Sequence, residues 1–267
     1  MTGSHLSVSL QTVKKIKRRT AGLGGPALKL PAFVIGYTAT DPPSAGPLAQ
    51  WFNQEYGGPL TIHLPRDQEM NLFEAQHGPW AALVETNLPP SIAGPWHERL
   101  GWRHTCAGQV LPLRTIGRDN RNVTLHVARL ARGLTLLTGG TAHDTATESY
   151  WNPSDWTDCP LREFHVADHL RIEQVSGRAD GREWFHTRGL SKFGLEDIET
   201  YRPIGLSERP VIEAFTAIAD VLILLGKAPN VGDCFEVNGI NRIVRVVRYR
   251  TDQSYGIRLN LREVEWD

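Results

Sequence analysis

The sequence predicts an α+β fold with a largely antiparallel sheet. Helix-like and strand-like patterns are mixed along the 267 residues, without the regular alternation that is typical of parallel α/β folds. Two segments show long helical spacing of apolar residues. Residues 227–267 contain three strand-like runs, and the first two are separated by the hairpin turn signal Asn238-Gly239. We therefore expect two long packed helices and a C-terminal β-meander.

The first part of the chain predicts a ferredoxin-like split β-α-β unit with an insertion. A strand, a helix and two more strands are followed by a fourth strand and a long helix. Ser44 is placed to cap the first helix. A proline-broken segment separates the third strand from the fourth. The predicted strands are residues 33–38, 60–64, 79–87 and 104–114.

The second part of the chain alternates strands and connections around the two long helices. The first long helix ends at Gly139-Gly140, and the second runs from Ser207 to Gly226. Residues 150–160 are predicted to form a loop. Residues 164–172 are predicted to form a strand, because their apolar side chains alternate. A further strand, "REWFHTRG", places Trp184, His186 and Arg188 on one face.

The domain organisation is predicted from composition. Residues 1–29 are expected to be a disordered basic tail ending in a glycine-rich linker. A single domain is expected over 30–267, in which 227–267 is a candidate small C-terminal β subdomain. Residues 1–40 contain six basic and no acidic residues, so the rest of the chain is acidic. An acidic body disfavours non-specific nucleic-acid binding. That leaves a basic arm for such contacts, made of Lys14, Lys15, Lys17, Arg18 and Arg19.

Composition and motifs also indicate the cellular compartment and which classes of cofactor site the sequence lacks. No apolar run approaches the ~20 residues of a membrane-spanning helix. The three cysteines, Cys106, Cys159 and Cys234, are widely spaced, which argues against a disulfide framework and favours a reducing cytoplasm. The sequence has neither a phosphate-binding glycine loop of the G-x-x-x-x-G-K-[ST] type nor a G-x-S-x-G nucleophile elbow. We expect a cytoplasmic protein without a membrane span and without a cofactor.

Histidines provide the candidates for a metal site. His165 and His169 have the H-x-x-x-H spacing that lets two imidazoles share a zinc ion on a helix. On the predicted strand the same residues span about 13 Å, which one ion cannot bridge. His143 lies beside Asp144 in a segment predicted to be a solvated turn. These three histidines are the metal candidates, and we predict that they hold no metal.

The segment "HTRGLSKFGLEDIE" is the main candidate site. Gly189 and Gly194 are expected to need positive φ or close backbone approach, with apolar side chains packed beneath the turn. Arg188 or Lys192 is expected to pair with Glu196 or Glu199. We interpret the segment mainly as a glycine-hinged connection between strands. The alternative is a ligand or partner surface formed by His186, Arg188, Gly189, Phe193, Gly194, Glu196 and Glu199.

The same segment resembles the T-x-G-L-x-x-F-G-x-x-x-[IL]-E element of a bacterial domain family of unknown function. The matching residues are Thr187, Gly189, Leu190, Phe193, Gly194, Ile198 and Glu199. The segments "HGPWAALV", "VARLARGLTLLTGG" and "GKAPNVGDCFE" also resemble parts of that family, in the same order. The resemblance covers about residues 30–240. It implies a related fold and implies no catalytic residues.

These observations predict a non-catalytic accessory protein, of the immunity type for example, that binds another protein. The support is the lack of a coherent catalytic set, together with loop tryptophans of the kind that anchor interfaces, namely Trp96, Trp102, Trp151 and Trp156. One alternative is a hydrolase or other enzyme with a His/Glu site around His186 and Glu196. Another is docking of the basic arm on nucleic acid or an anionic surface.

Overall fold

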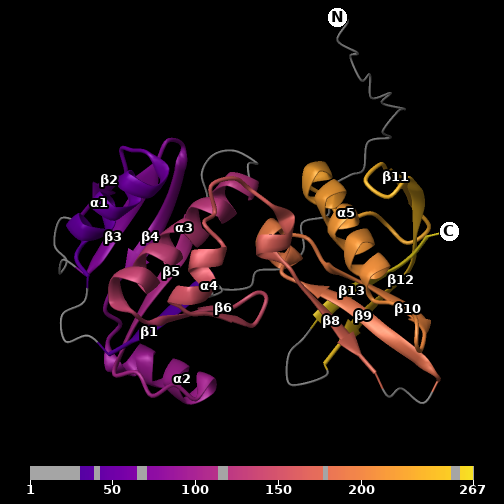
Figure 1. The fold of residues 1–267 in the computed structure, drawn as a ribbon, viewed down its shortest axis with the longest axis horizontal. Coiled ribbons are helices and arrows are strands. Elements are labelled where there is room, and N and C mark those ends of the chain that lie inside the picture. The colour runs from indigo at the N-terminus through magenta and orange to yellow at the C-terminus, as the bar shows by residue number, and fades with distance from the viewer. Residues whose placement is uncertain are drawn as a thin grey trace, which may run out of the picture.

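Two β-sheets with helices packed on them make up the protein. The computed structural model describes residues 31–38, 43–64, 71–113, 120–176, 180–253 and 259–266, and the predicted basic tail lies outside them. A seven-stranded sheet A belongs to the N-terminal half, residues 31–161, and a six-stranded sheet B to the C-terminal half, residues 166–266 (Figure 1). The α+β prediction is confirmed, but the strands form two sheets rather than one.

Sheet A contains the predicted split β-α-β unit. Its strand order is β2-β3-β4-β5-β1-β6-β7, and every neighbouring pair is antiparallel. Because β5 and β6 both pair antiparallel with β1, they run parallel to each other with β1 between them, and α3 connects them. The strands are β1 (Phe33–Tyr37), β2 (Thr61–His63), β3 (Leu72–His77), β4 (Trp80–Glu85), β5 (Cys106–Leu113), β6 (Thr141–Asp144) and β7 (Ser149–Trp151).

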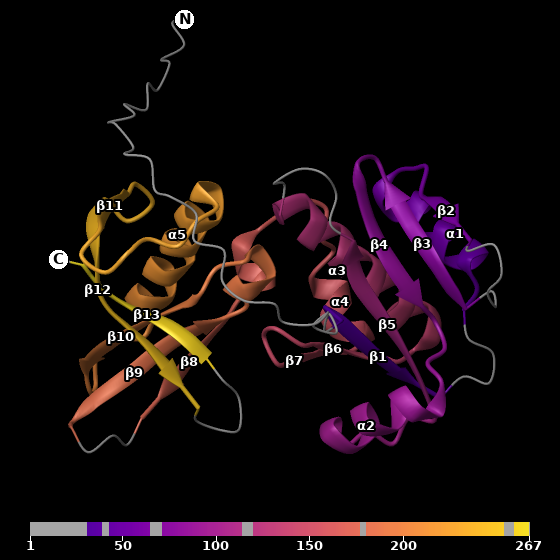
Figure 2. The same cartoon turned by 180° about the vertical axis from the view of Figure 1, so that it is seen from behind.

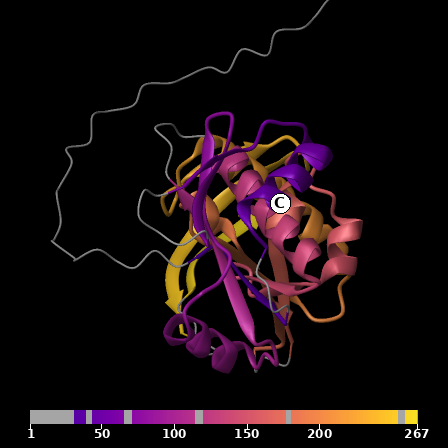
Figure 3. The same cartoon turned by 90° about the vertical axis from the view of Figure 1, so that its left-hand side faces the viewer.

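The helices of the N-terminal half lie on both faces of sheet A. One face is covered by α1 (Ala45–Tyr56), α3 (Asn120–Thr138) and α4 (Pro153–Asp158), whereas α2 (Pro90–Leu100) lies on the other side (Figures 2 and 3). The main core lies under α1 and α3 and includes Phe52, Phe73, Leu130 and Leu134. Gly133 brings α3 close to α1, since an added Cβ there lies 2.6 Å from the Trp51 ring.

Sheet B has the order β11-β12-β13-β10-β9-β8, and α5 (Arg209–Leu225) covers one face. The predicted meander is present in β11–β13, but β13 also pairs with β10, so residues 227–267 do not form a sheet of their own. Among the described strands, β10–β13 is the one parallel pair. The strands are β8 (Arg171–Val175), β9 (Arg182–Arg188), β10 (Asp197–Pro203), β11 (Cys234–Val237), β12 (Arg242–Asp252) and β13 (Leu259–Trp266).

Several local predictions were wrong. His143 and Asp144 do not lie in a solvated turn, because both are buried in β6. Residues 164–172 are not a continuous strand, because Val166–His169 form a 3₁₀ helix, η1, and β8 begins only at Arg171. The predicted loop 150–160 contains α4, which a capping box stabilises: Asn152 Oδ1 accepts from the backbone of Asp155, and Asp155 Oδ2 accepts from Asn152 N at 2.8 Å. Strand β3 was not predicted at all.

The two long helices pack on different sheets. α3 covers sheet A, whereas α5 covers sheet B, and an ion pair between Arg121 and Asp220 joins them. The two long helices of the prediction are therefore present, each packed on its own sheet. None of the described helices is long and apolar enough to cross a membrane. Cys106, Cys159 and Cys234 are all described, and none forms a disulfide.

Candidate functional site

The segment from His186 to Glu199 connects β9 to β10 through a short 3₁₀ helix, η2 (Leu190–Phe193). Gly189 has φ 117°, and an added Cβ there lies 2.5 Å from the carbonyl oxygen of His169. Gly194 ends η2 with φ 72°. Leu190, Phe193 and Ile198 are buried in the core beneath α5. The predicted need for glycine at both positions is confirmed, because other residues rarely adopt these dihedral angles.

One face of β9 turns away from α5 and carries Trp184, His186 and Arg188, as predicted, and all three side chains are buried. His186 lies opposite Glu199 of β10 on one side and opposite Glu173 of β8 on the other. Cross-strand partners share a face of the sheet. A row of buried polar side chains therefore crosses three adjacent strands.

Glu173 is the centre of the first ionic cluster on this face. Its Oε2 lies 3.2 Å from His186 Nε2 and accepts a hydrogen bond from Arg188 Nε at 3.0 Å, while its Oε1 lies 3.2 Å from Arg171 Nε. Burial by itself raises the pKa of this carboxyl group. The hydrogen bond from His186 and the two guanidinium charges outweigh burial and lower the pKa of Glu173 to about 2.

Glu199 is the centre of the second cluster and is fully buried. It accepts hydrogen bonds from Trp184 Nε1 at 2.7 Å and from Arg250 Nε at 2.7 Å, and a second nitrogen of Arg250 makes the contact bidentate. Arg250 also pairs with Asp252 and lies over the Trp184 ring. These contacts raise the pKa of Arg250, chiefly through the hydrogen bond to Glu199.

Glu196 and Asp197 are held separately from this face. Glu196 pairs with Arg262 of β13. Asp197 Oδ1 accepts from Thr187 Oγ1 at 3.0 Å and from Leu190 N at 3.2 Å, which fixes the turn. Burial raises the pKa of Asp197 to about 6, although these hydrogen bonds oppose it.

The expected ion pairs within the segment were wrong. Arg188 pairs with Glu173, and Lys192 pairs with Asp144, so neither contacts Glu196 or Glu199. The reason is that β8, β12, β13 and β6 bring partners from distant parts of the chain. His186 and Glu196 also belong to different ion pairs, so the structure does not assemble the His/Glu pair of the enzyme alternative.

Lys192 joins the two halves of the molecule. Its Nζ contacts Asp144 Oδ2 at the end of β6 and donates to the His169 carbonyl at 3.0 Å. Both charged side chains are almost fully buried, with 7% and 3% exposure. Asn120 Nδ2 donates to the Phe193 carbonyl at 3.1 Å across the same junction. The segment therefore works as a connector between the two sheets.

The three histidine metal candidates have different surroundings. His143 of β6 is buried, and its Nε2 lies 3.4 Å from Glu148 Oε2. His169 stacks on Phe164, and burial lowers its pKa to about 3. His165 precedes η1. No group of three His, Cys, Asp or Glu side chains in the described ranges is placed to hold a metal ion.

The four tryptophans proposed as interface anchors have different surroundings. Trp156 is buried, and Trp151 stacks on it with ring centroids 4.6 Å apart. Trp96 packs against the small core of α2. Trp102 lies between the rings of His97 and His104. All four therefore have packing partners inside the fold.

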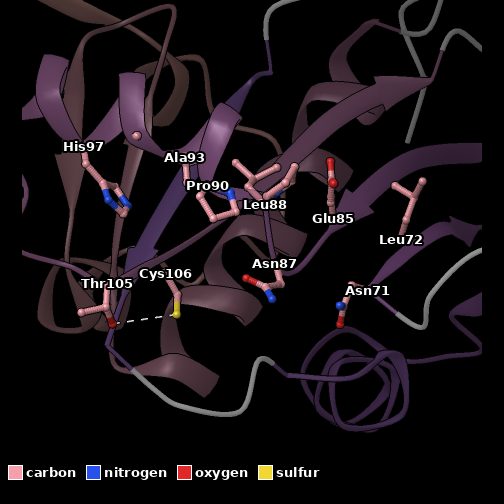
Figure 4. Close-up of a pocket in the computed structure, with 12 residues that line it drawn as sticks. Asn71, Leu72, Glu85, Asn87, Leu88, Pro90, Ala93, His97, Thr105 and Cys106 are labelled. Carbon is pink, nitrogen blue, oxygen red and sulfur yellow. Dashed lines mark hydrogen bonds between the residues drawn. The ribbon is translucent and has the colours of Figure 1, made fainter.

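A cavity that sequence reasoning missed lies between α2 and sheet A. Its volume is about 770 Å³. Figure 4 shows its lining residues, which come from the start of β3, the end of β4, α2 and the start of β5. The available signal was the pair of asparagines, Asn71 and Asn87, that flank two strand ends beside a proline-rich helix.

Comparisons of the chain with family models, curated proteins and solved structures give no match. The resemblance of residues 187–199 to a bacterial domain family therefore stays a prediction.

Proposed function

We propose that this is a non-catalytic accessory protein of the bacterial cytoplasm, of the immunity type for example, that binds another protein through exposed apolar side chains at the ends of α5. The single observation that carries the proposal is the exposure of these large apolar side chains. The residues first considered as a partner surface support a different role. His186, Arg188 and Glu199 are buried and engaged in ion pairs inside the fold.

Large apolar side chains are exposed near both ends of α5. Ile212 is 39% exposed in its first turn, and Leu224 and Leu225 are 65% and 51% exposed in its last turn. Between them the side turned away from sheet B carries polar residues such as Glu213 and Asp220, as is usual for a helix that covers a sheet. Exposed apolar side chains that gather at the helix ends are typical of a surface that a partner covers.

The connection that precedes α5 also exposes large apolar side chains. Ile204 is 55% exposed and Leu206 is 49% exposed. Beyond the helix, Val231 is 53% exposed. Exposed apolar side chains thus occur before, along and after one helix of the C-terminal half, and interface cores are richer in such residues than ordinary surface.

Affinity capture with matched variants tests the proposal. The tagged full-length chain, its Leu224→Glu/Leu225→Glu variant and an Ile243→Glu control are incubated with lysate of the source organism. Ile243 is 64% exposed and lies on β12, outside α5. We expect one stoichiometric protein with the wild type and the control, lost with the α5 variant, at equal melting temperatures. Failure to recover a stoichiometric protein, or equal recovery with the α5 variant, contradicts the proposal.

A further inference from the structure

The cavity beside α2 has a fixed frame. The turn between β4 and α2 is bonded to neighbouring strands, because Leu88 N donates to Ala107 O at 2.7 Å and Thr86 N donates to Asn71 O at 2.8 Å. The Tyr37 hydroxyl also donates to the carbonyl of Thr86. A frame held by backbone bonds keeps its shape without a ligand, which is typical of small-molecule sites.

Polar side chains from three parts of the N-terminal half line this cavity. Asn71 lies at the start of β3, Asn87 lies in the turn after β4, and Thr105 precedes β5. His97 of α2 lines the same cavity, and its Nε2 is buried without a hydrogen-bond partner among the described residues. Figure 4 shows these side chains around the hollow.

The charge of the lining selects the class of ligand. Glu85 is the one acidic side chain among the described lining residues, and none of them is Lys or Arg. Gln109 Nε2 donates to Glu85 Oε2 at 2.9 Å, which orients the carboxylate and leaves Oε1 for a ligand. A carboxylate with amide and hydroxyl oxygens suits an ammonium group, whereas an organic anion meets repulsion.

The rest of the lining is apolar. Leu72, Leu88, Pro90 and Ala93 form walls that suit a hydrocarbon skeleton. A volume of about 770 Å³ is within the range of drug-sized ligand pockets. The site therefore offers one anionic acceptor and a hydrophobic surface beside it.

We propose that this cavity binds a small organic amine, with its ammonium group on Glu85 and its hydrocarbon part against α2. The site lies in the N-terminal half and is independent of the α5 surface, so either proposal can fail without the other.

Binding of a matched pair of probes tests the ligand class. Phenethylamine and 3-phenylpropanoate share an aromatic skeleton and differ in charge. We titrate each into the isotope-labelled full-length protein and follow the side-chain amide signals of Asn71 and Asn87 by NMR. Phenethylamine is expected to bind saturably with a Kd of about 1 mM or tighter, as suits a ligand of this size. Glu85→Gln is expected to weaken it about tenfold.

Variants of two helical glycines test the location. Gly94 lines the cavity, and an added Cβ there meets nothing within 4 Å, so Gly94→Leu fills the space and also favours helix. Gly46 of α1 is equally open but lies outside the cavity, so Gly46→Leu is the control. We expect Gly94→Leu to abolish phenethylamine binding and Gly46→Leu to preserve it. No saturable binding, equal binding of 3-phenylpropanoate, or unchanged affinity in Gly94→Leu overturns the proposal.

Discussion

The two sheets differ in the side chains on the faces that turn away from their main helices. On sheet A, aromatic and imidazole rings lie on this face: Trp102 contacts His104 and Tyr150, and Tyr150 contacts His143. On sheet B, the face that turns away from α5 carries ion pairs around Glu173 and Glu199. Burial lowers the pKa of His143, although Glu148 and Asp144 oppose it. One face is thus stabilised by uncharged rings and the other by paired charges, which predicts different responses to mutation and to pH.

The largest effect is expected from breaking the charge cluster on sheet B. Glu199→Ala leaves Arg250 without its bidentate partner and Trp184 Nε1 without an acceptor. Removing one partner of a buried ion pair costs about 3–5 kcal/mol of the free energy of unfolding. Urea denaturation measures this loss. Arg248→Ala is the control, because Arg248 is 54% exposed in its pair with Glu263 and its loss is expected to cost about 0–1 kcal/mol. Equal losses would show that burial of the charges is not decisive.

A smaller loss is expected at the junction of the two halves. Lys192→Met leaves Asp144 buried without its cation, and we expect a loss of about 3 kcal/mol. The double variant Asp144→Asn/Lys192→Met removes both charges and is expected to recover at least half of that loss. Urea denaturation of the two single variants and the double variant measures the coupling. Additive losses would contradict the assigned contact.

The contrast between the sheets also predicts two separate acid windows. Burial lowers the pKa of His126, on α3, to about 4, despite a hydrogen bond to the Ala75 carbonyl. Because the folded pKa is below the ordinary value of 6.5, the unfolded chain binds this proton first, and stability falls from pH 6.5 to about 4. Glu173, with a pKa of about 2 against 4.5, stabilises the fold above pH 4.5 and loses that contribution toward pH 2.

Single substitutions separate the two windows. His126→Gln keeps a donor for the Ala75 carbonyl and is expected to flatten the dependence of stability on pH between 6.5 and 4. Glu173→Gln is expected to flatten it between 4.5 and 2. Each contribution is on the order of 3 kcal/mol at most. Urea denaturation midpoints of the wild type and both variants, measured from pH 7 to pH 2.5, test these expectations. If the dependence of stability on pH is unchanged in a variant, the substituted residue is not responsible for the loss of stability in its pH range.

The smallest effect is expected on sheet A. An added Cβ at Gly36 lies 2.4 Å from the rings of Trp102 and His104, so Gly36→Ala forces these rings off the sheet. Overpacking of this kind costs about 1–2 kcal/mol, measured by thermal unfolding. Gly46→Ala, in open space on α1, is the control and is expected to leave stability equal or higher. A neutral Gly36→Ala variant would mean that the aromatic layer is loosely held.

Strong local signals made part of the fold predictable. The apolar spacing predicted α3 and α5, and the Asn238-Gly239 turn predicted the hairpin of β11 and β12. These predictions succeeded because each signal depends only on residues that are close in sequence. The strand period of β9 also predicted which side chains share a face. Strand β3 was missed because "LFEAQH" lacks β-branched residues, and α4 was missed although Asn152 and Asp155 carry a capping signal.

The partners within the candidate site were beyond prediction. Glu173, Arg250 and Arg262 reach the segment 186–199 through strand pairing, and nothing in local sequence indicates which strands become neighbours. The same holds for Asp144, which approaches Lys192 from the other sheet. The division of the strands into two sheets likewise depends on long-range pairing.

The position of β13 between β12 and β10 has a consequence for synthesis on the ribosome. Residues 259–266 leave the exit tunnel after all the other strands of sheet B, yet they pair with both of these neighbours. One edge of β10 therefore stays open while translation continues, and exposed strand edges invite wrong pairing. Until residues 259–266 emerge, the C-terminal half therefore exposes a strand edge that the folded protein covers.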